Sequence, residues 1–308
     1  ANTTGTRNTA VGALAGDALT DADDNVAIGQ TALGSDTLGS KSVAVGRAAL
    51  ATQNFTSATD SYNTAVGFQA GEAVTTGTDN TLIGGLAGDA ATTASGITFV
   101  GKSAGSATTT GGDNTGLGKQ ALKSTTTGTA NTAVGKDALE ANTTASNNTA
   151  VGFKTLEANT TGAGNAAVGK TALTTNTTGT LNAALGQDAL GLNTTGSNNT
   201  AVGESALYAN TTADNNTAVG KSALVANTTG TRNIGVGSNT GAAITTGSYN
   251  VLMGAYAGDA ITTGEQNVAV GDAALSANIT GTDNVSIGDQ SLKVNTASNN
   301  TAVGSSAL

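Results

Sequence analysis

The chain has 308 residues, of which 37% are hydrophobic and 3% aromatic, and its formal net charge is −9. It has no cysteine, histidine, proline or tryptophan, which excludes disulfides, Cys/His metal sites and catalysis by cysteine or histidine. The modest acidic charge without a basic run argues against nucleic acid as a partner. No apolar stretch approaches the length of a membrane span, and no signal peptide is recognised.

A 17-residue repeat extends along the whole chain, and we take as position 0 the residue that opens each unit, which is asparagine except at Ser42 and Ile97. Residues 131–145 closely follow the consensus Asn-Thr-Ala-Val-Gly-x-x-Ala-Leu-x-Ala-Asn-Thr-Thr-Gly-x-x. Self-similarity at a fixed period is the signature of a solenoid, and it predicts one continuous repeat domain over residues 1–308. The first residue falls at position 10 and the last at position 8, so we expect a segment of a longer fibre. Position 4 is glycine in every unit, and we expect a structural turn at Gly12, Gly29, Gly46, Gly67, Gly84, Gly101, Gly135, Gly152, Gly169, Gly203 and Gly220.

Positions 1 to 3 predict a short β-strand, because β-branched residues alternate there with small ones, as in 132–134. We expect position 3 and position 8 to face the core, so that Val134 and Leu139 are buried. Glycine at position 4 and Gly or Ala near position 14 mark turns that need positive φ or a close backbone approach. Asparagines at positions 0 and 11 are expected to stack in ladders. The predicted fold is an all-β parallel β-solenoid, or β-roll, of about 18 coils.

Two kinds of coil alternate in blocks. Most units have leucine at position 8 and a polar residue at position 11, whereas six units have glycine at position 8 and mostly an apolar residue at position 11. An unfilled core position would cost a cavity. We therefore expect two turn conformers that fill one shared core, and we call the coils Leu-type and Gly-type. The glycines at position 8 are Gly16, Gly71, Gly88, Gly105, Gly241 and Gly258.

The interval between Ser42 and Asn63 is longer than the repeat. The extra residues lie in 53–62 and include Phe55. A surface loop that bulges from the solenoid is the simplest interpretation, because loops of this kind tolerate insertions.

A column of small residues at position 2 suits close packing against another surface. Each coil has few large aliphatic residues, and a thin core is marginal for an isolated chain. We therefore expect a parallel homotrimer, with subunit contacts at Ala133, Ala150, Ala167, Ala184, Ala201 and Ala218. The alternative is that position 2 faces solvent.

The segments SVAVG at 42–46, NVAIG at 25–29 and NVSIG at 284–288 resemble the head repeats of YadA-type trimeric autotransporter adhesins. The longer unit at 216–230 is similar to repeats in phage tail-fibre proteins. The resemblance implies a trimeric left-handed β-roll with an adhesive role. It also implies an extracellular location, on a virion tail fibre or a bacterial surface.

Two segments match the phosphate-loop pattern, at 96–103 and 164–171. A true phosphate loop follows a strand and opens a helix. Here the expected strand lies inside the pattern and no helix is expected, so the repeat itself explains the match. The Asn-x-Thr sequons at Asn142, Asn159 and Asn176 are explained in the same way, by the asparagine ladder. Adjacent threonines such as Thr143 and Thr144 alternate sides of the chain, so they do not form a double row of the kind that binds ice.

Acidic residues suggest two further kinds of site. Paired carboxylates at position 9 could cleave glycosidic bonds, but a repeated column is expected to be solvated. Asp21, Asp23 and Asp24 could bind calcium, although the glycine-rich repeat of calcium-binding β-rolls is absent. The acidic residues at position 9 are Asp17, Glu72, Asp89, Glu140, Glu157 and Asp259.

The sequence predicts a non-enzymatic fibre segment that acts as a rigid spacer and an attachment surface for a cell-surface glycan or protein. We assign no catalytic residue, cofactor or metal. Exposed aromatic rings could stack on receptor sugars, and Phe55, Tyr62, Tyr249 and Tyr256 are the candidates, with turn packing as the alternative. Two other functions stay open: a ligand-binding solenoid for ice or glycan, and a depolymerase.

Overall fold

The computed structural model describes residues 2–308, and these form strands, turns and loops only. No helix that could cross a membrane is found in this range. The chain divides into two compact units, Ala1–Phe153 and Lys154–Leu308. Such a division is natural in a solenoid, because a coil contacts only its neighbours and no long-range contact ties distant coils together.

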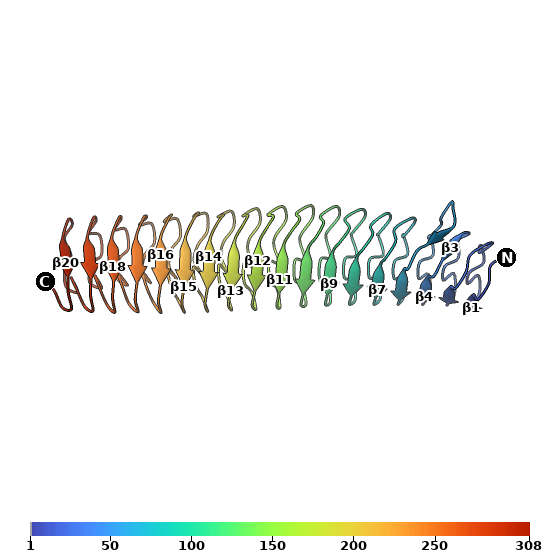
Figure 1. The fold of residues 1–308 in the computed structure, drawn as a ribbon, viewed down its shortest axis with the longest axis horizontal. Helices are drawn as coiled ribbons and strands as arrows, with labels where there is room; N and C mark the ends of the chain where they lie inside the picture. The colour runs from blue at the N-terminus through green and yellow to red at the C-terminus, as the bar shows by residue number, and fades with distance from the viewer. Residues whose placement is uncertain (1) are drawn as a thin grey trace. The chain divides into compact units, whose positions relative to one another are not determined.

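The main strands of the first unit pair in parallel, each with the equivalent strand of the next coil (Figure 1). Thr132 pairs with Thr149, Ala133 with Ala150 and Val134 with Val151, so the register advances by one whole repeat. The strands are β1 (Thr9–Val11), β2 (Val26–Ile28), β4 (Val43–Val45), β6 (Thr64–Val66), β7 (Thr81–Ile83), β8 (Thr98–Val100), β9 (Thr115–Leu117), β10 (Thr132–Val134) and β11 (Thr149–Val151).

The second unit repeats this arrangement. Its strands also pair in parallel in chain order, as Ala201 with Ala218 and Ala269 with Ser286 show. Each unit is therefore a parallel β-solenoid with a 17-residue repeat, as the sequence predicted. The strands are β12 (Ala166–Val168), β13 (Ala183–Leu185), β14 (Thr200–Val202), β15 (Thr217–Val219), β16 (Ile234–Val236), β17 (Val251–Met253), β18 (Val268–Val270), β19 (Val285–Ile287) and β20 (Thr301–Val303).

The strands face the core with position 2, so our assignment of position 3 to the core is wrong. Ala133 is fully buried, whereas Val134 is only half-buried and Val66 is 36% exposed. Leu139 at position 8 is fully buried, as predicted. Alternation showed that positions 1 and 3 lie opposite position 2, but it did not show which side is inside. Position 2 needs only a small residue such as alanine, because the leucine at position 8 fills the space in front of it.

This orientation also corrects the expected subunit contacts. The position-2 alanines, among them Ala150, Ala201 and Ala218, are fully buried inside their own coils, and Ala184 is 3% exposed. A second chain cannot reach them. A homotrimer would have to use another face of the solenoid.

The invariant glycines at position 4 have φ between 129° and 144° in every coil. Residues other than glycine rarely adopt this conformation. The space is closed as well: a Cβ on Gly135 would lie 2.7 Å from the carbonyl carbon of Gly152, the equivalent residue one coil further. Both expected reasons for the glycine are confirmed, since each coil approaches the next through its backbone at this point.

Two asparagine ladders complete the core. At position 0, the Asn131 side-chain oxygen accepts the Asn148 backbone N–H at 3.0 Å, and the Asn131 amide donates to the Ala145 carbonyl at 2.9 Å. At position 11, the Asn193 amide donates to the Asn176 side-chain oxygen at 2.7 Å. All of these asparagines are buried. The ladders supply the hydrogen bonds that buried amides require, so this prediction is confirmed.

Leu-type and Gly-type coils share one backbone, and our expectation of two turn conformers is wrong. Position 8 is left-handed in both kinds, with φ of 51° at Leu139 and 59° at Gly105. The shared core is confirmed, but it is filled in two ways. Position 11 supplies a buried Val74 in one Gly-type coil, and position 2 supplies a buried Phe99 in another.

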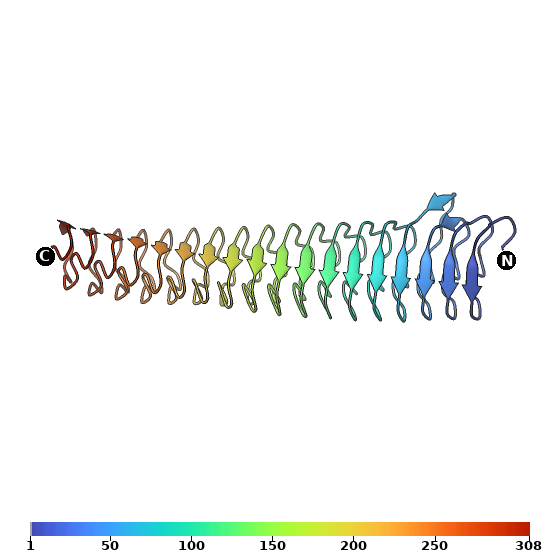
Figure 2. The ribbon, with the colours of Figure 1, turned by 60° about the horizontal axis from the view of Figure 1, so that its bottom comes forward.

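The insertion at 53–62 raises a loop above the main strands of the first unit, where β3 (Gly39–Ser40) pairs in parallel with β5 (Thr59–Asp60) (Figure 2). The base of the loop is packed. Phe55 is only 5% exposed and lies against Gly39. The buried Gln53 donates to the buried Asp36 carboxylate at 2.6 Å and to the Ser42 hydroxyl at 2.8 Å. The expected bulge is therefore anchored by its own buried network.

Candidate binding surfaces

A groove of about 380 Å³ lies on the first unit. Position 9 is acidic in the two flanking coils, as Asp17 and Glu72, and small in the two coils between them, as Gly34 and Ala51. Because Gly34 and Ala51 have no long side chain, a groove is left between Asp17 and Glu72. Arg47 at position 5 lies on its rim. Small residues and polar side chains line the groove together, and a concave site of this size with several polar groups can hold a small polar ligand.

The two carboxylates of this groove are poorly placed for glycoside cleavage. Asp17 and Glu72 belong to coils separated by two others, so strand spacing puts their backbones roughly 14 Å apart. Glycosidases need their carboxyl groups closer, within about 5 to 9.5 Å. The Glu72 carboxylate also accepts a hydrogen bond from the Gln69 side chain at 2.6 Å.

The acidic column at position 9 is less solvated than we expected, since Asp17 is exposed but Glu72, Asp89, Glu140 and Asp259 are half-buried. Burial raises the pKa of Asp89, and the nearby Glu72 charge adds to this effect. Burial also raises the pKa of Asp259. Each of these two aspartates keeps a buried carboxylate oxygen without a hydrogen-bond partner.

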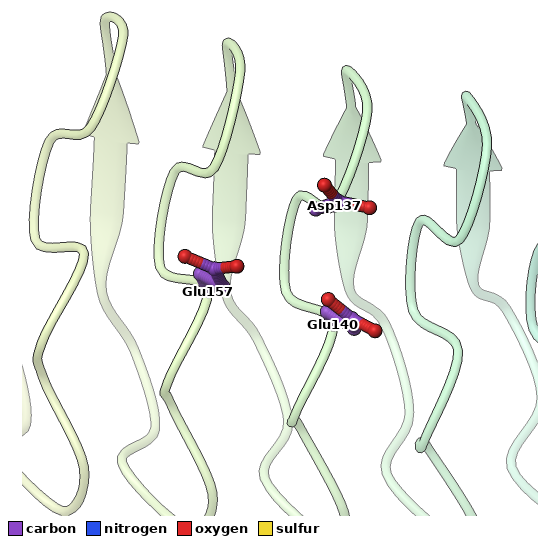
Figure 3. Close-up of side chains that lie close together, drawn as sticks. All are labelled: Asp137, Glu140 and Glu157. Carbon is purple, nitrogen blue, oxygen red and sulfur yellow. The ribbon is translucent and has the colours of Figure 1, made fainter.

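Asp137 and Glu140 follow one another on one coil of the first unit (Figure 3). Their carboxylate oxygens lie within 4.8 Å of one another, but each is paired with a lysine. Lys136 lies 3.2 Å from Asp137 and Lys123 lies 3.1 Å from Glu140. Glu157, also drawn, belongs to the second unit and has its own partner, Lys154, at 2.7 Å. These ion pairs partly neutralise the three carboxylates, whereas the buried Asp137 Oδ1 has no hydrogen-bond partner.

The acidic cluster near the start of the chain is bonded to the preceding coil. Asp21 accepts a hydrogen bond from the Thr4 hydroxyl at 2.8 Å, and Asp23 accepts one from the Thr6 hydroxyl at 2.8 Å. Asp24 pairs with the Arg7 guanidinium, which lowers the pKa of that carboxyl. Each carboxylate thus has a partner in the neighbouring coil, and the three do not converge as calcium ligands.

The phosphate-loop pattern has the structure of an ordinary coil. β8 lies inside the first match and β12 inside the second, and no helix follows either. Lys102 and Lys170 are exposed instead of folding over a loop. The sequons belong to the ladders, because Asn142, Asn159 and Asn176 are fully buried. Both patterns are therefore products of the repeat, as we expected.

The candidate aromatic residues differ in exposure. Tyr62, Tyr249 and Tyr256 are 54%, 48% and 49% exposed. Phe55 is buried, so its assignment to receptor contact is wrong; it anchors the loop at 53–62 instead. Tyr62 lies beneath the Lys41 ammonium at 5.1 Å and Tyr249 beneath the Arg232 guanidinium at 5.3 Å. The sequence did not show that Phe68, which is 47% exposed, stacks with Arg47 at the groove.

The outward side of the strands is a surface that our reading of the sequence missed. Positions 1 and 3 face away from the core, so threonines and aliphatic residues form two outer columns that are half-buried to exposed, with Ile83 38% and Leu117 39% exposed. No charged residue occupies either position in β6 to β11. The β-branched residues at positions 1 and 3 could have indicated this surface, but our assignment of position 3 to the core concealed it.

No protein-family model matches the chain, and no curated protein matches it in sequence.

Proposed function

We propose that the chain is a non-enzymatic structural segment of an extracellular fibre, either a phage tail fibre or a bacterial surface adhesin. It would act as a spacer and present an attachment surface. The observation that carries the proposal is the repetition of the same contacts between coils: the position-4 glycine contact and the position-0 asparagine ladder recur along each unit, and the position-11 ladder joins Asn159 to Asn227 in the second unit.

These contacts favour a stiff element. Each coil is joined to the next through backbone hydrogen bonds and buried amide ladders, so bending would break many bonds together. Position 12 adds a third ladder, in which the Thr177 hydroxyl donates to the Thr194 carbonyl at 3.0 Å. A repeated surface of this kind is suited to spacing and display, because equivalent groups recur from coil to coil.

Removal of whole repeats tests the spacer role. Deletion of residues 182–249, which are four repeat lengths, should leave the second unit folded and shorten it by about 19 Å. Deletion of residues 182–190 breaks the register and should unfold neighbouring coils. Circular dichroism and the lengths of particles in electron micrographs measure the two results. A whole-repeat deletion that unfolds the unit, or cleavage of polysaccharides by the intact chain, would contradict the proposal.

The groove on the first unit is the feature that best fits attachment. Its small-residue floor, the Arg47 guanidinium and the Asp17 and Glu72 carboxylates can bond hydroxyl groups, and the Phe68 ring beside Arg47 can stack on a sugar. A cell-surface glycan is therefore the ligand that we propose.

A glycan array probed with the intact chain tests this attachment. Arg47→Ala should reduce glycan binding at least tenfold. Arg232→Ala is the matched control, because Arg232 stacks on Tyr249 in the second unit; it should bind as the wild type does. Binding that is equal in both variants would exclude the groove and leave the spacer role to be judged by the deletions.

A further inference from the structure

Six consecutive strands of the first unit, β6 to β11, carry threonine at position 1 and an aliphatic residue at position 3. We call their outward side the threonine face. The aliphatic column includes Val66, Ile83 and Leu117, which are 36 to 39% exposed. The threonines are Thr64, Thr81, Thr98, Thr115, Thr132 and Thr149.

The hydroxyls of this face are not used by the fold. Among the described residues, none of the six side chains makes a hydrogen bond within the chain. Threonines at position 12 behave differently: the Thr92 hydroxyl donates to the Thr109 carbonyl at 3.0 Å, and the Thr109 hydroxyl to the Thr126 carbonyl at 3.2 Å. The threonine face therefore presents a row of hydroxyls that can both donate to and accept from solvent.

The geometry of the face is regular. Hydroxyls recur at about 4.8 Å along the stack, and the aliphatic column lies about 6.7 Å away, two residues along each strand. Threonine, valine and isoleucine are stiff at χ1, so the side chains keep their positions without a further loss of entropy on binding. The underlying backbone is held by the glycine and asparagine ladders.

The face is also neutral and small. The chain carries a net charge of −9, yet no charged residue lies at position 1 or 3 of these strands. An uncharged partner fits such a surface. The footprint is about 29 Å by 7 Å from strand spacing, or roughly 200 Å², whereas a stable protein interface needs about 800 Å² from each partner. The size favours a repetitive, non-protein partner.

We propose that the threonine face binds ice. Each hydroxyl bonds one water molecule at a fixed spacing, and the methyl and aliphatic groups restrict the orientation of the water between them. The hydroxyl row thus orders a layer of water that merges with the surface of an ice crystal. Many weak contacts act together, so affinity rises with the number of aligned coils. This activity is additional to the spacer role and uses a face that the role leaves free.

The second unit contains a natural comparison. Its strands β12, β13 and β16 to β19 carry Ala, Ile or Val at position 1 in place of threonine. They retain an exposed aliphatic column, as Leu185 at 51% and Met253 at 45% show, but they lack a continuous hydroxyl row. Deletion of residues 182–249 should therefore leave ice binding unchanged.

Slow growth of polycrystalline ice from a solution of the intact chain tests the proposal. Wild type should enter the ice, and Thr98→Lys/Thr115→Lys should lower the incorporated fraction at least tenfold. Thr93→Lys/Thr110→Lys places the same charges on exposed threonines at position 13 and should not change incorporation. Thr98→Val/Thr115→Val keeps the side-chain shape and removes only the hydroxyls, and it should lower incorporation severalfold without loss of folding.

Exclusion of the wild-type chain from ice would overturn the proposal, as would equal incorporation of the two lysine variants. Light scattering tests whether copies of the chain associate through this face instead. An oligomer that Thr98→Lys/Thr115→Lys dissociates would show that copies of the chain cover this face, and ice binding would be rejected. The spacer role is tested independently by the whole-repeat deletion, so the two proposals fail separately.

Discussion

Residues 63–113 and 114–153 of the first unit build the same coil with different side chains. The first block has glycine at position 8, as at Gly88 and Gly105, and the second has leucine, as at Leu122 and Leu139. Position 8 has φ between 51° and 60° in all of these coils. The comparison shows that the repeat sets the backbone. The core is filled by compensating side-chain sizes at positions 2, 8 and 11.

Leucine and glycine at position 8 each carry an energetic cost. Leucine at position 8 fills the core but must adopt a left-handed conformation, which costs roughly 1 to 2 kcal/mol. Glycine adopts that conformation freely but leaves a space. Phe99 fills it beside Gly105, and the next coil has Gly116 at position 2, where a Cβ would lie 3.0 Å from the Phe99 ring. Neighbouring coils are thus matched to one another.

The largest effect is expected where the blocks do not differ, at position 4. A Cβ on Gly84 would lie 2.7 Å from the carbonyl group of Gly101, and φ there is 131°. Gly84→Ala should lower the free energy of unfolding by roughly 3 kcal/mol. Gly85→Ala is the matched control, because its Cβ has only one neighbour, at 3.9 Å; it should change stability by less than about 0.5 kcal/mol. Urea unfolding compares the two, and equal effects would contradict the close-approach explanation.

The compensation between positions 2 and 8 can be tested within one coil. Phe99→Ala should leave a cavity and cost about 3 to 5 kcal/mol. Gly105→Leu alone should clash with the Phe99 ring, which lies against Gly105. The double variant recreates a Leu-type coil, so it should be more stable than either single variant, with a coupling energy of about 2 kcal/mol. Purely additive effects in a double-mutant cycle would show that the two positions do not share one space.

The asparagine ladder of the Leu-type coils gives a smaller effect. Asn193 donates to the Asn176 side-chain oxygen at 2.7 Å and to the Gly196 carbonyl at 2.9 Å. Asn193→Ala leaves both buried acceptors without this donor and should cost about 2 kcal/mol. Thr195→Ala alters an exposed side chain two residues away and serves as the control. Thermal unfolding measures both, and a neutral Asn193→Ala would show that the ladder adds no stability.

The smallest effect concerns pH and position 9 of the Gly-type block. Burial raises the pKa of Asp89 above its ordinary value of 3.8. The folded state therefore binds more protons than the unfolded state just above pH 3.8, and stability is lost as pH rises through this window. Asp89→Asn should raise the melting temperature at pH 7, and the gain should vanish below pH 3.8.

The Leu-type block provides the control for that pH effect. Glu140 is paired with Lys123 at 3.1 Å, so Glu140→Gln removes an ion pair and should not raise the melting temperature at pH 7. A gain of the same size in both variants would indicate that general charge repulsion, and not the burial of Asp89, is responsible.

The fold could be predicted from the repeat because each coil contributes the same signals. The invariant glycine, the two asparagine columns and the β-branched segment fixed the strands, the turns and the ladders. The candidate surfaces could be predicted only in part. The burial of the sequons followed from the asparagine ladder. The groove depends on the small size of Gly34 and Ala51, and its presence can be recognised only when the coils are stacked.

The repeat is sufficient to specify a parallel β-solenoid, because the period, the invariant glycine and the strand alternation act within one repeat and recur along the chain. The side of the strand that faces the core, by contrast, becomes clear only from the packing of the folded coil. Alternation is symmetric with respect to the two faces, and the choice depends on the leucine at position 8, which fills the core and leaves room only for a small residue, usually alanine, at position 2. That choice buries the alanine column, exposes the threonine face and moves any contact with a partner to residues that the repeat alone did not single out.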